Sequence, residues 1–280
     1  MSNVVKVRRF ISTGFINIFV MLFSLFCIFP YIWMIYSSFK TEAEFRLNII
    51  ALPTSLYFDN FVNAIRVASM DTYVWNSLFN SLITVVLVTL GAFIVGYFIS
   101  RFSFKGRRII YMLFVAGMLI PVHSLLVPLF MQFRFMGMLD NRFTLLPVYF
   151  AFAMPMAVFL MESYLSSVPI ELEEAAMIDG SSIVRTMFSI IMPLCRPVIA
   201  TITILTFMNA WNEFPFALVL IRSTALRTIP VGLRAFQGAH TATFTQFIAG
   251  MVIAMLPVML VYVLFYKKII LGMTAGSIKG

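Results

Sequence analysis

The chain has 280 residues, of which 61% are hydrophobic and only 11% are charged, against roughly 25% charged residues in a soluble domain. Its 31 Phe and 20 Met residues exceed what a soluble core of this size requires, so a soluble domain is excluded and a polytopic membrane protein is indicated. The net charge of +9 does not indicate a nucleic-acid partner, because the basic residues lie in short loops beside apolar runs. Cys27 and Cys195 are far apart in the chain, and we expect free thiols.

Six apolar runs are long enough to cross a bilayer, because a spanning helix needs about 20 apolar residues. They lie near residues 13–37, 77–99, 109–132, 143–164, 198–220 and 243–266. The first run is too long for a cleavable signal, so we interpret it as a span. The predicted fold class is all-α: a polytopic membrane protein with an N-terminal segment (1–12), one domain of six transmembrane helices (13–266) and a C-terminal tail (267–280).

The distribution of basic residues predicts the orientation of the chain. The loops on one side, together with both termini, contain twelve Lys and Arg residues, and the loops on the other side contain eight. The compact segment 101–108, RFSFKGRR, contains four of the twelve. Since cytoplasmic loops carry the excess of Lys and Arg, we expect both termini and the loop 168–197 on the cytoplasmic side.

The longest external segment is expected between the first two spans, from Lys40 to Trp75. Pro53, Asp59 and Asn60 mark turns in it. A short interfacial helix is expected around residues 61–67. The segment is too short and too apolar to form an independent domain.

A polar stripe follows one face of the second span. Asn76, Asn80 and Thr84 recur every four residues and therefore share one side of a helix. Because polar side chains are costly in lipid, this side should face other helices or a water-filled path. Two interpretations stay open, which are interhelical hydrogen bonding and a solute pathway.

Prolines interrupt the third and fourth spans. Pro121 and Pro128 each remove a helical hydrogen bond and predict kinks, and broken helices are common at transport sites. Pro147 and Pro155 predict a broken fourth span in the same way. His123 lies in the third span, and we interpret it as a packing or pathway-lining residue rather than a proton relay, because no residue at relay spacing accompanies it.

The segment 168–197, VPIELEEAAMIDGSSIVRTMFSIIMPLCRP, is the longest amphipathic, charged stretch in the chain. Pro169 suits the first position of a helix, and carboxylates in the first turns complement the positive end of the helix dipole. These carboxylates belong to Glu171, Glu173 and Glu174. Gly180, which follows Asp179, predicts the end of this helix because glycine tolerates the left-handed conformation.

A second short helix is expected after this turn. Ser181 or Ser182 would cap its N-terminus, and Pro193 and Pro197 would end it. The result is a helix-turn-helix between spans 4 and 5, with five acidic residues, counting Glu162, against two arginines. A charged hairpin beside a membrane predicts a docking partner, and the alternative is an interfacial hairpin without one.

The spacing within this loop carries a family resemblance. Glu174-Ala175-Ala176, three residues, Gly180, nine residues, Ile190, one residue and Met192-Pro193 resemble the "EAA" loop of bacterial ABC importer permeases. Met192 stands where Leu is usual, which is a volume-conserving exchange. Further similarity to the carbohydrate-uptake branch, with its maltose-type and glycerol-phosphate-type permeases, comes from Asp179, Phe188 and Pro197.

The resemblance implies that this chain is one half of a heterodimeric pore in the bacterial inner membrane, with a cytoplasmic coupling loop. The implied partners are a second homologous permease subunit, two ATPase subunits, an extracytoplasmic solute-binding protein and membrane lipid. ATP and Mg would bind to the ATPases, and this chain would bind no cofactor and no metal. The residues implied in ATPase docking are Glu171, Glu174, Ala175, Ala176, Asp179 and Gly180.

The fifth predicted span contains a second polar face. Thr206, Asn209 and Glu213 fall at i, i+3 and i+7 of a helix, and Asn212 lies beside them. Glu213 is the only carboxylate deep in a predicted span, which makes it a functional-site hypothesis. The WNEF stretch resembles carbohydrate-type permeases, and its amide, carboxylate and indole groups suit the hydroxyls and apolar faces of a sugar.

We therefore name seven candidates for the solute pathway. They are Asn76, Asn80, His123, Thr206, Asn209, Asn212 and Glu213. For Glu213 the alternative is an interfacial carboxylate held by Arg222 or Arg227.

The C-terminal segment KKIILGMTAGSIKG resembles the tail of maltose-type permeases, which in some of them reaches between the two ATPase subunits. The residues that would make this contact are Thr274, Gly276 and Lys279. The alternative is a frayed terminus.

The sequence thus predicts a permease subunit of a binding-protein-dependent ABC importer for a sugar, an oligosaccharide, or a related polyol or glycerol phosphate. It contains no nucleotide-binding motif and no nucleophile–base pair, so we expect a transporter subunit rather than an enzyme. The alternative class is an ion-coupled secondary transporter with Glu213 and His123 as proton carriers. An intramembrane enzyme is the least favoured class.

Overall fold

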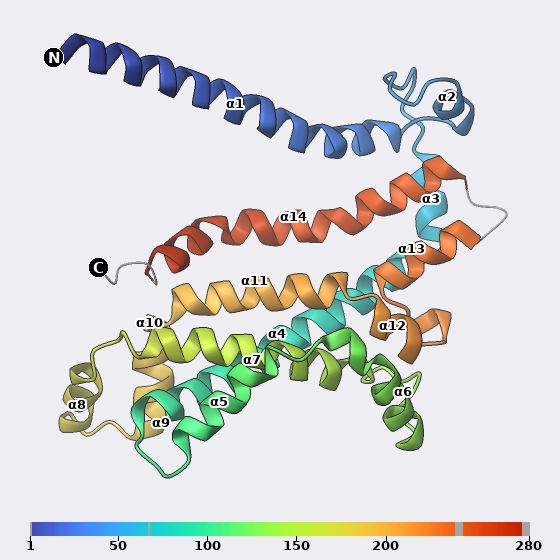
Figure 1. Cartoon of the computed structure of the whole chain (residues 1–280). Coiled ribbons are helices and arrows are strands. Elements are labelled where there is room, and N and C mark those ends of the chain that lie inside the picture. The colour runs from blue at the N-terminus through green and yellow to red at the C-terminus, as the bar shows by residue number, and fades with distance from the viewer. Residues whose placement is uncertain (1, 67, 239–242, 276–280) are drawn as a thin grey trace. The chain divides into compact units, whose positions relative to one another are not determined.

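The computed structural model describes residues 2–66, 68–238 and 243–275, with side chains for 13–66, 68–234, 236 and 243–265. Within these ranges the chain consists of helices and connecting segments without a strand (Figure 1). Two compact units are present, and each is considered by itself. Unit 1 comprises Met1–Ala68 with Phe236–Ile253, and unit 2 comprises Ser69–Ala235 with Ala254–Gly280.

Unit 1 contains the long apolar helix α1 (Ser2–Ser37), the short helices α2 (Glu42–Leu47) and α3 (Asp59–Arg66), and the first part of α14 (Phe244–Ala275). Over its most apolar stretch α1 buries no residue in this chain. Such a surface requires lipid or another subunit around it. A short helix was expected around residues 61–67, and α3 confirms it with a start at Asp59, whereas α2 was not predicted.

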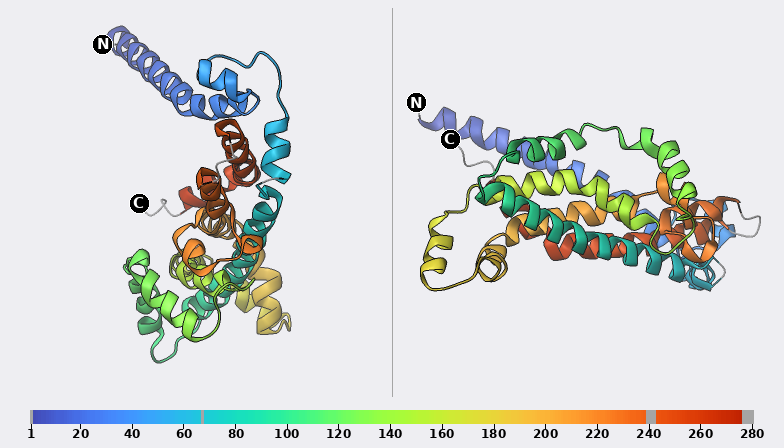
Figure 2. Two further views of the ribbon diagram at one scale, coloured as in Figure 1. Left: turned by 90° about the vertical axis from the view of Figure 1, so that its right-hand side faces the viewer. Right: turned by 90° about the horizontal axis from the view of Figure 1, so that it is seen from below.

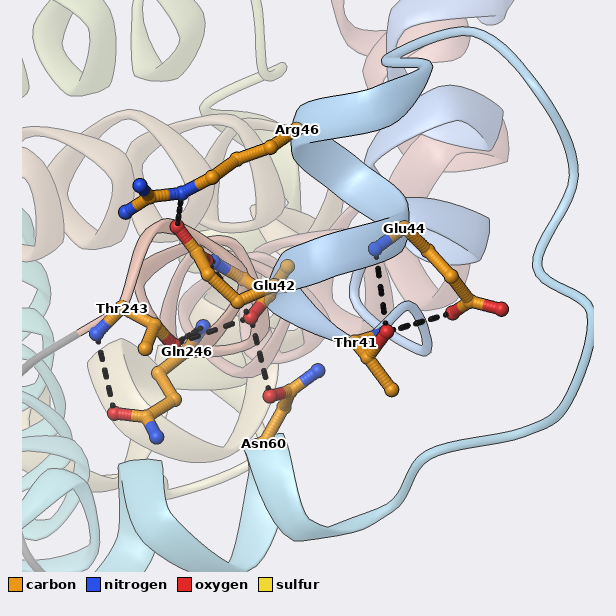
Figure 3. A network of polar contacts seen from close by, with 8 residues as sticks. Thr41, Glu42, Glu44, Arg46, Asn60, Thr243 and Gln246 are labelled. Carbon is orange, nitrogen blue, oxygen red and sulfur yellow. Dashed lines mark hydrogen bonds and ion pairs between the residues drawn. The ribbon is translucent and has the colours of Figure 1, made fainter.

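Polar contacts organise the connecting segment of unit 1. Thr41 caps α2, since its backbone and hydroxyl donate to the Glu44 carboxylate and its hydroxyl oxygen accepts from the Glu44 N–H. On the same helix, Glu42 pairs with Arg46 at 2.9 Å and accepts from the Thr245 hydroxyl at 3.4 Å (Figure 3). The segment predicted as a plain turn region is therefore a small ordered structure.

Buried polar groups also support this segment from within. The amide of Asn60 donates to the carbonyls of Ser38 and Lys40 at 2.8 and 2.7 Å. The buried ammonium of Lys40 donates to the carbonyls of Asn48 and Ile49 at 3.1 and 2.9 Å. Both side chains thus satisfy backbone groups that would otherwise lack partners.

Unit 2 contains most of the remaining helices. In chain order they are α4 (Met70–Arg101), α5 (Arg107–Gly117), η1 (Val122–Leu125), α6 (Leu126–Phe135), α7 (Leu145–Leu165), α8 (Glu171–Ile178), α9 (Ile183–Arg185), the π-helical η2 (Thr186–Ile191), α10 (Met192–Leu194), α11 (Arg196–Asn212), α12 (Pro215–Leu220), η3 (Thr224–Leu226) and α13 (Ile229–Gly238), whose last residues belong to unit 1.

The core of unit 2 lies where α4 packs against α7 and α11. Small residues allow this close packing, since a Cβ atom added to Gly96 would lie 2.9 Å from Cγ of Met161. Buried Phe93 and Tyr97 fill the space beside them. Cys195 is free and buried in this core, and Cys27 on α1 is free and exposed, as the sequence predicted.

Among the residues that the structure describes, four helices are individually long and apolar enough to cross a membrane, and six spans result if each of two bent helix pairs counts as one. The four are Thr13–Ser37, Met70–Arg101, Leu145–Leu165 and Phe244–Phe265. The pair Arg107–Gly117 and Val122–Phe135 is bent by 90°, and the pair Ile183–Leu194 and Arg196–Asn212 by 77°. The fold agrees with the predicted all-α membrane protein and is compatible with six spans.

The predicted proline breaks were right at Pro121 and wrong at Pro128 and in the fourth span, since Pro128 lies in the first turn of the continuous helix α6. The chain bends between Gly117 and Val122, next to Pro121. Pro147 instead lies in the first turn of α7, where a helix leaves N–H groups unpaired in any case. Helix α7 therefore continues unbroken from Leu145 to Leu165, with Pro155 inside it.

The fifth span differs from its predicted extent of 198–220. Helix α11 ends at Asn212, and α12 starts at Pro215. The break falls on Glu213 and Phe214, so one expected span consists of two helices.

Candidate solute cavity and docking loop

Unit 2 contains a partly open cavity of about 310 Å³ between α4, α7, α11, α12 and the segment η1. Its lining residues are Thr84, Val122, His123, Tyr149, Phe152, Ala153, Thr206, Asn209, Ala210, Glu213 and Phe216. The wall is largely apolar and aromatic, with a few polar groups and one carboxylate. Small-molecule sites commonly have this composition.

The cavity brings together four of the seven pathway candidates. His123, Thr206, Asn209 and Glu213 line it, although His123 comes from a different segment than the other three. Thr84, the third member of the stripe on α4, also lines the cavity. Its buried hydroxyl has no hydrogen-bond partner within the described ranges, which leaves it free for a ligand or water.

Glu213 is held by a helix terminus. Its carboxylate accepts from the N–H groups of Phe216 at 2.7 Å and Ala217 at 3.0 Å, and from the Tyr149 hydroxyl at 3.0 Å. The carboxylate therefore caps the positive end of α12. Neither of the two arginines considered as its partners supplies these three bonds. The guanidinium of Arg227 donates to the carbonyl of Arg222, and the backbone N–H of Arg222 donates to Asp140.

The other three pathway candidates lie outside the cavity lining. The Asn76 amide donates to the carbonyls of Ala225 and Arg227 at 2.9 Å each, and its oxygen accepts from Arg142 at 2.6 Å. Asn80 donates to the carbonyl of Asn76 at 2.8 Å. Asn212 is exposed and donates to the carbonyl of Met208 within its own helix. Asn76 thus fastens α4 to the segment around η3.

The loop 168–197 has the local structure that its sequence predicted, with small shifts at its ends. Gly180 ends the first helix with a φ of +81°, and Ser182 caps the second by accepting from the N–H of Arg185. Helix α8 begins at Glu171 rather than at Pro169. Pro193 and Pro197 were predicted to end the second helix and instead lie in the first turns of α10 and α11, where a proline is tolerated.

Most of the residues implied in docking are exposed. Glu171, Glu174, Ala175, Asp179 and Gly180 lie on the surface of the described chain, whereas Ala176 is buried. In Figure 2 the loop is the yellow segment at one end of the unit 2 helices. Gly276 and Lys279 of the tail lie outside the described residues, as does the side chain of Thr274.

The sequence did not predict the buried contacts that α8 makes with α4. Oε1 of Glu173 lies 2.5 Å from Nε of Arg101, and Oε2 accepts from the Tyr97 hydroxyl at 2.7 Å. The side chains of Arg101 and Glu173 are 8% and 4% exposed. Arg101 also donates to the carbonyl of Val168 at 2.9 Å. The only signal in the sequence was the spacing of Glu173 and Ala176, which places both on one side of a helix.

Within the described ranges, no group of three or more His, Cys, Asp and Glu side chains is arranged to hold a metal ion. The cavity places polar side chains within an apolar helix bundle, which in a membrane protein marks a candidate transport site.

Comparisons with known proteins identify the family. Residues 89–273 match the model of the family described as "Binding-protein-dependent transport system inner membrane component". The chain is 36% identical over 267 residues to the trehalose/maltose transport system permease protein MalG of Thermococcus litoralis, which covers 92% of this chain and 94% of that protein. It is 34% identical over 254 residues to the sulfoquinovosyl glycerol transport system permease protein SmoH of Agrobacterium fabrum, covering 90% and 89%.

Two solved structures share the fold. One is a bacterial ABC transporter involved in the import of the acidic polysaccharide alginate, with a TM-score of 0.79, 24% identity, and coverage of 95% of this chain and 98% of that chain. The other is a bacterial alginate ABC transporter in complex with an alginate pentasaccharide-bound periplasmic protein, with a TM-score of 0.61, 16% identity and 93% coverage of each chain. The chain belongs to the family of inner membrane components of binding-protein-dependent transport systems, which confirms the resemblance drawn from the EAA loop.

Proposed function

We propose that this chain is one of two permease subunits of an ABC importer that carries a sugar or an oligosaccharide across the bacterial inner membrane. The observation that carries the proposal is the exposed acidic helix α8, fixed to the same helical unit that contains the polar, aromatic cavity. Relatives that match about nine-tenths of the chain are named for trehalose, maltose and a sulfoquinovosyl glycerol.

The cavity forms this subunit's share of the solute pathway. Thr84, His123, Thr206 and Asn209 offer hydroxyl, imidazole and amide groups to sugar hydroxyls, while Phe152 and Phe216 offer apolar surface. Glu213 contributes mainly by fixing the break between α11 and α12, because its oxygens already accept three hydrogen bonds. Asn76 and Asn80 support the wall from outside the lining, and Asn212 belongs to the rim.

The partners are a second homologous permease, two ATPase subunits and an extracytoplasmic solute-binding protein. With six spans, residues 1–12, the loop 168–197 and the tail 267–280 lie on one side of the membrane, and the excess of Lys and Arg on that side supports a cytoplasmic location. The chain itself binds no cofactor, since ATP and Mg are held by the ATPases. The tail residues Thr274, Gly276 and Lys279 add a second contact with the ATPases.

The loop transmits ATP-driven closure of the ATPases to the spans. Glu171, Glu174 and Asp179 present carboxylates to basic groups of an ATPase, and Ala175 allows close approach of the two backbones. Ala176 lies on the buried face of α8 and packs this helix against its own subunit. Movement of the loop rocks the helices between inward-open and outward-open states, which is alternating access.

The first experiment is purification of the tagged chain from its native membrane in mild detergent, followed by mass spectrometry. We expect a second permease and two copies of an ATPase. A chain that is recovered alone or as a homodimer, even after crosslinking at Glu174, would contradict the proposal.

A variant tests the loop directly. Gly180→Val places a β-branched residue at a φ of +81°, where only glycine is unstrained. We expect ATP hydrolysis that no longer drives uptake. Unaltered uptake would refute the coupling role, and uptake that follows the proton gradient and ignores ATP would instead indicate the ion-coupled transporter.

A further inference from the structure

Two neighbouring glutamates of α8 face opposite ways. Glu174 is exposed, whereas Glu173 is buried against Arg101 at the last position of α4. Their different surroundings separate two functions within one helix. The exposed carboxylate of Glu174 is available to a partner protein, and the buried carboxylate of Glu173 binds groups of this chain.

The contact at Glu173 joins elements that are distant in the sequence. It links α8 to a residue 72 positions earlier, and Arg101 also holds the carbonyl of Val168, at the start of the loop. Tyr97, one turn before Arg101 on α4, donates to the same carboxylate. The start of the loop and the first turn of α8 are thereby fixed to a single helix.

Helix α4 connects this contact to the cavity. Thr84 and Arg101 lie 17 residues apart on one uninterrupted helix, which corresponds to about 26 Å at 1.5 Å per residue. Because α4 packs along α7 and α11, a displacement of its end moves the wall that Thr84 contributes. A rigid helix is a direct physical route for coupling.

We propose that the buried Arg101–Glu173 ion pair, with the Tyr97 hydroxyl, is the positioning contact that transmits movement of α8 to α4 and so to the solute cavity. The proposal rests on the proposed function, and it assigns to Glu173 a role different from docking. Loss of this contact should leave ATPase binding intact, but the accessibility of the cavity should no longer change when ATP binds to the ATPases.

The test uses the purified complex of this chain with its partner subunits. A cysteine at the cavity residue Ala153 serves as the probe in a Cys27→Ser background, and buried Cys195 is retained. Maleimide labelling of this cysteine is measured without nucleotide and with ATP plus vanadate. With the native ion pair we expect the labelling rate to change by about fivefold or more.

Four variants separate transmission from docking. In Glu173→Gln we expect normal ATPase capture and loss of the ATP-dependent change in labelling. In Glu174→Gln, the matched exposed neighbour, we expect reduced capture. The double exchange of Glu173→Arg with Arg101→Glu should restore the ATP-dependent change in labelling. Tyr97→Phe keeps the ion pair and should give a partial change. This variant still tests the inference if Glu173→Gln fails to assemble.

Each remaining outcome overturns the inference. A full ATP-dependent change in both Glu173→Gln and Tyr97→Phe would show that the contact transmits nothing. Capture that falls as far in Glu173→Gln as in Glu174→Gln would show that the ion pair only shapes the loop for docking. Absence of ATPases from the complex with the native ion pair would remove the proposed function itself, which distinguishes that failure from the other two.

Discussion

Glu173, which is buried, and Glu213, which is half-buried, are two carboxylates in the same helical unit, and they are stabilised in different ways. Glu173 has a guanidinium partner, Arg101, and the hydroxyl of Tyr97. Glu213 has the N–H groups at the start of α12 and the hydroxyl of Tyr149. The first arrangement joins distant elements through charge, and the second closes a break in one span through largely local bonds. Each carboxylate thus has a structural role that is independent of any solute.

The largest expected effect comes from removing the cation beside Glu173. Arg101→Met leaves a carboxylate buried without its counter-charge, and we expect a loss of about 3–5 kcal/mol in the free energy of unfolding. Chemical denaturation of the purified protein in detergent measures this loss. The exposed neighbour Arg108 provides the control, since Arg108→Met should change stability by less than about 0.5 kcal/mol.

Adding Glu173→Gln to Arg101→Met sharpens this prediction. The double variant should recover much of the lost stability, because no unpaired charge remains buried. Additive losses would show that the two side chains are not coupled.

A smaller effect is expected at Glu213. Glu213→Ala leaves two N–H groups at the start of α12 without their partner, and we expect a loss of about 1–3 kcal/mol. Glu213→Gln retains an acceptor oxygen and should lose less. Thermal unfolding of both variants checks the order, with Asn212→Ala as the exposed control. Equal losses in Gln and Ala variants would indicate that the charge, rather than the hydrogen bonds, stabilises the break.

The two tyrosines allow a direct comparison of the two sites. Tyr97→Phe and Tyr149→Phe each remove one hydroxyl donor from a carboxylate, and we expect each to reduce the free energy of unfolding by about 1 kcal/mol. The same denaturation experiment measures both. A much larger loss for Tyr97→Phe would show that the ion pair depends on this hydroxyl for its geometry.

The smallest effect concerns Glu44, a half-buried carboxylate outside the spans. Hydrogen bonds from Thr54 and from the backbone of Thr41 lower the pKa of Glu44 from 4.5 to about 2. A lowered pKa in the folded state means that these bonds stabilise the segment fully above pH 4.5 and are lost as the pH falls through about 2. The difference in Tm between the unmodified protein and Thr54→Val should therefore shrink on acidification across this range, and a constant difference would contradict this assignment.

Local features of the fold could be predicted from the sequence. The lengths of the apolar runs predicted membrane-spanning helices, because every backbone group in lipid needs a partner inside its own helix. Gly180 and Ser182 predicted the turn and the cap in the docking loop, since both act through their immediate neighbours. The position of Pro147 is also a local feature, but a break was wrongly predicted there. The predicted span began two residues before the true helix start at Leu145, so Pro147 was not recognised as a first-turn residue.

Only the tertiary structure decided which polar residues face the cavity. Asn76 and Thr84 share one stripe on α4, yet one contacts the carbonyls near η3 and the other lines the cavity. The pairing of Glu173 with Arg101 and the contact of Glu213 with Tyr149 join residues 72 and 64 positions apart. Helical periodicity determines the side of a helix on which a residue lies, but the neighbour on that side depends on how separate helices pack, and no local pattern encodes that packing.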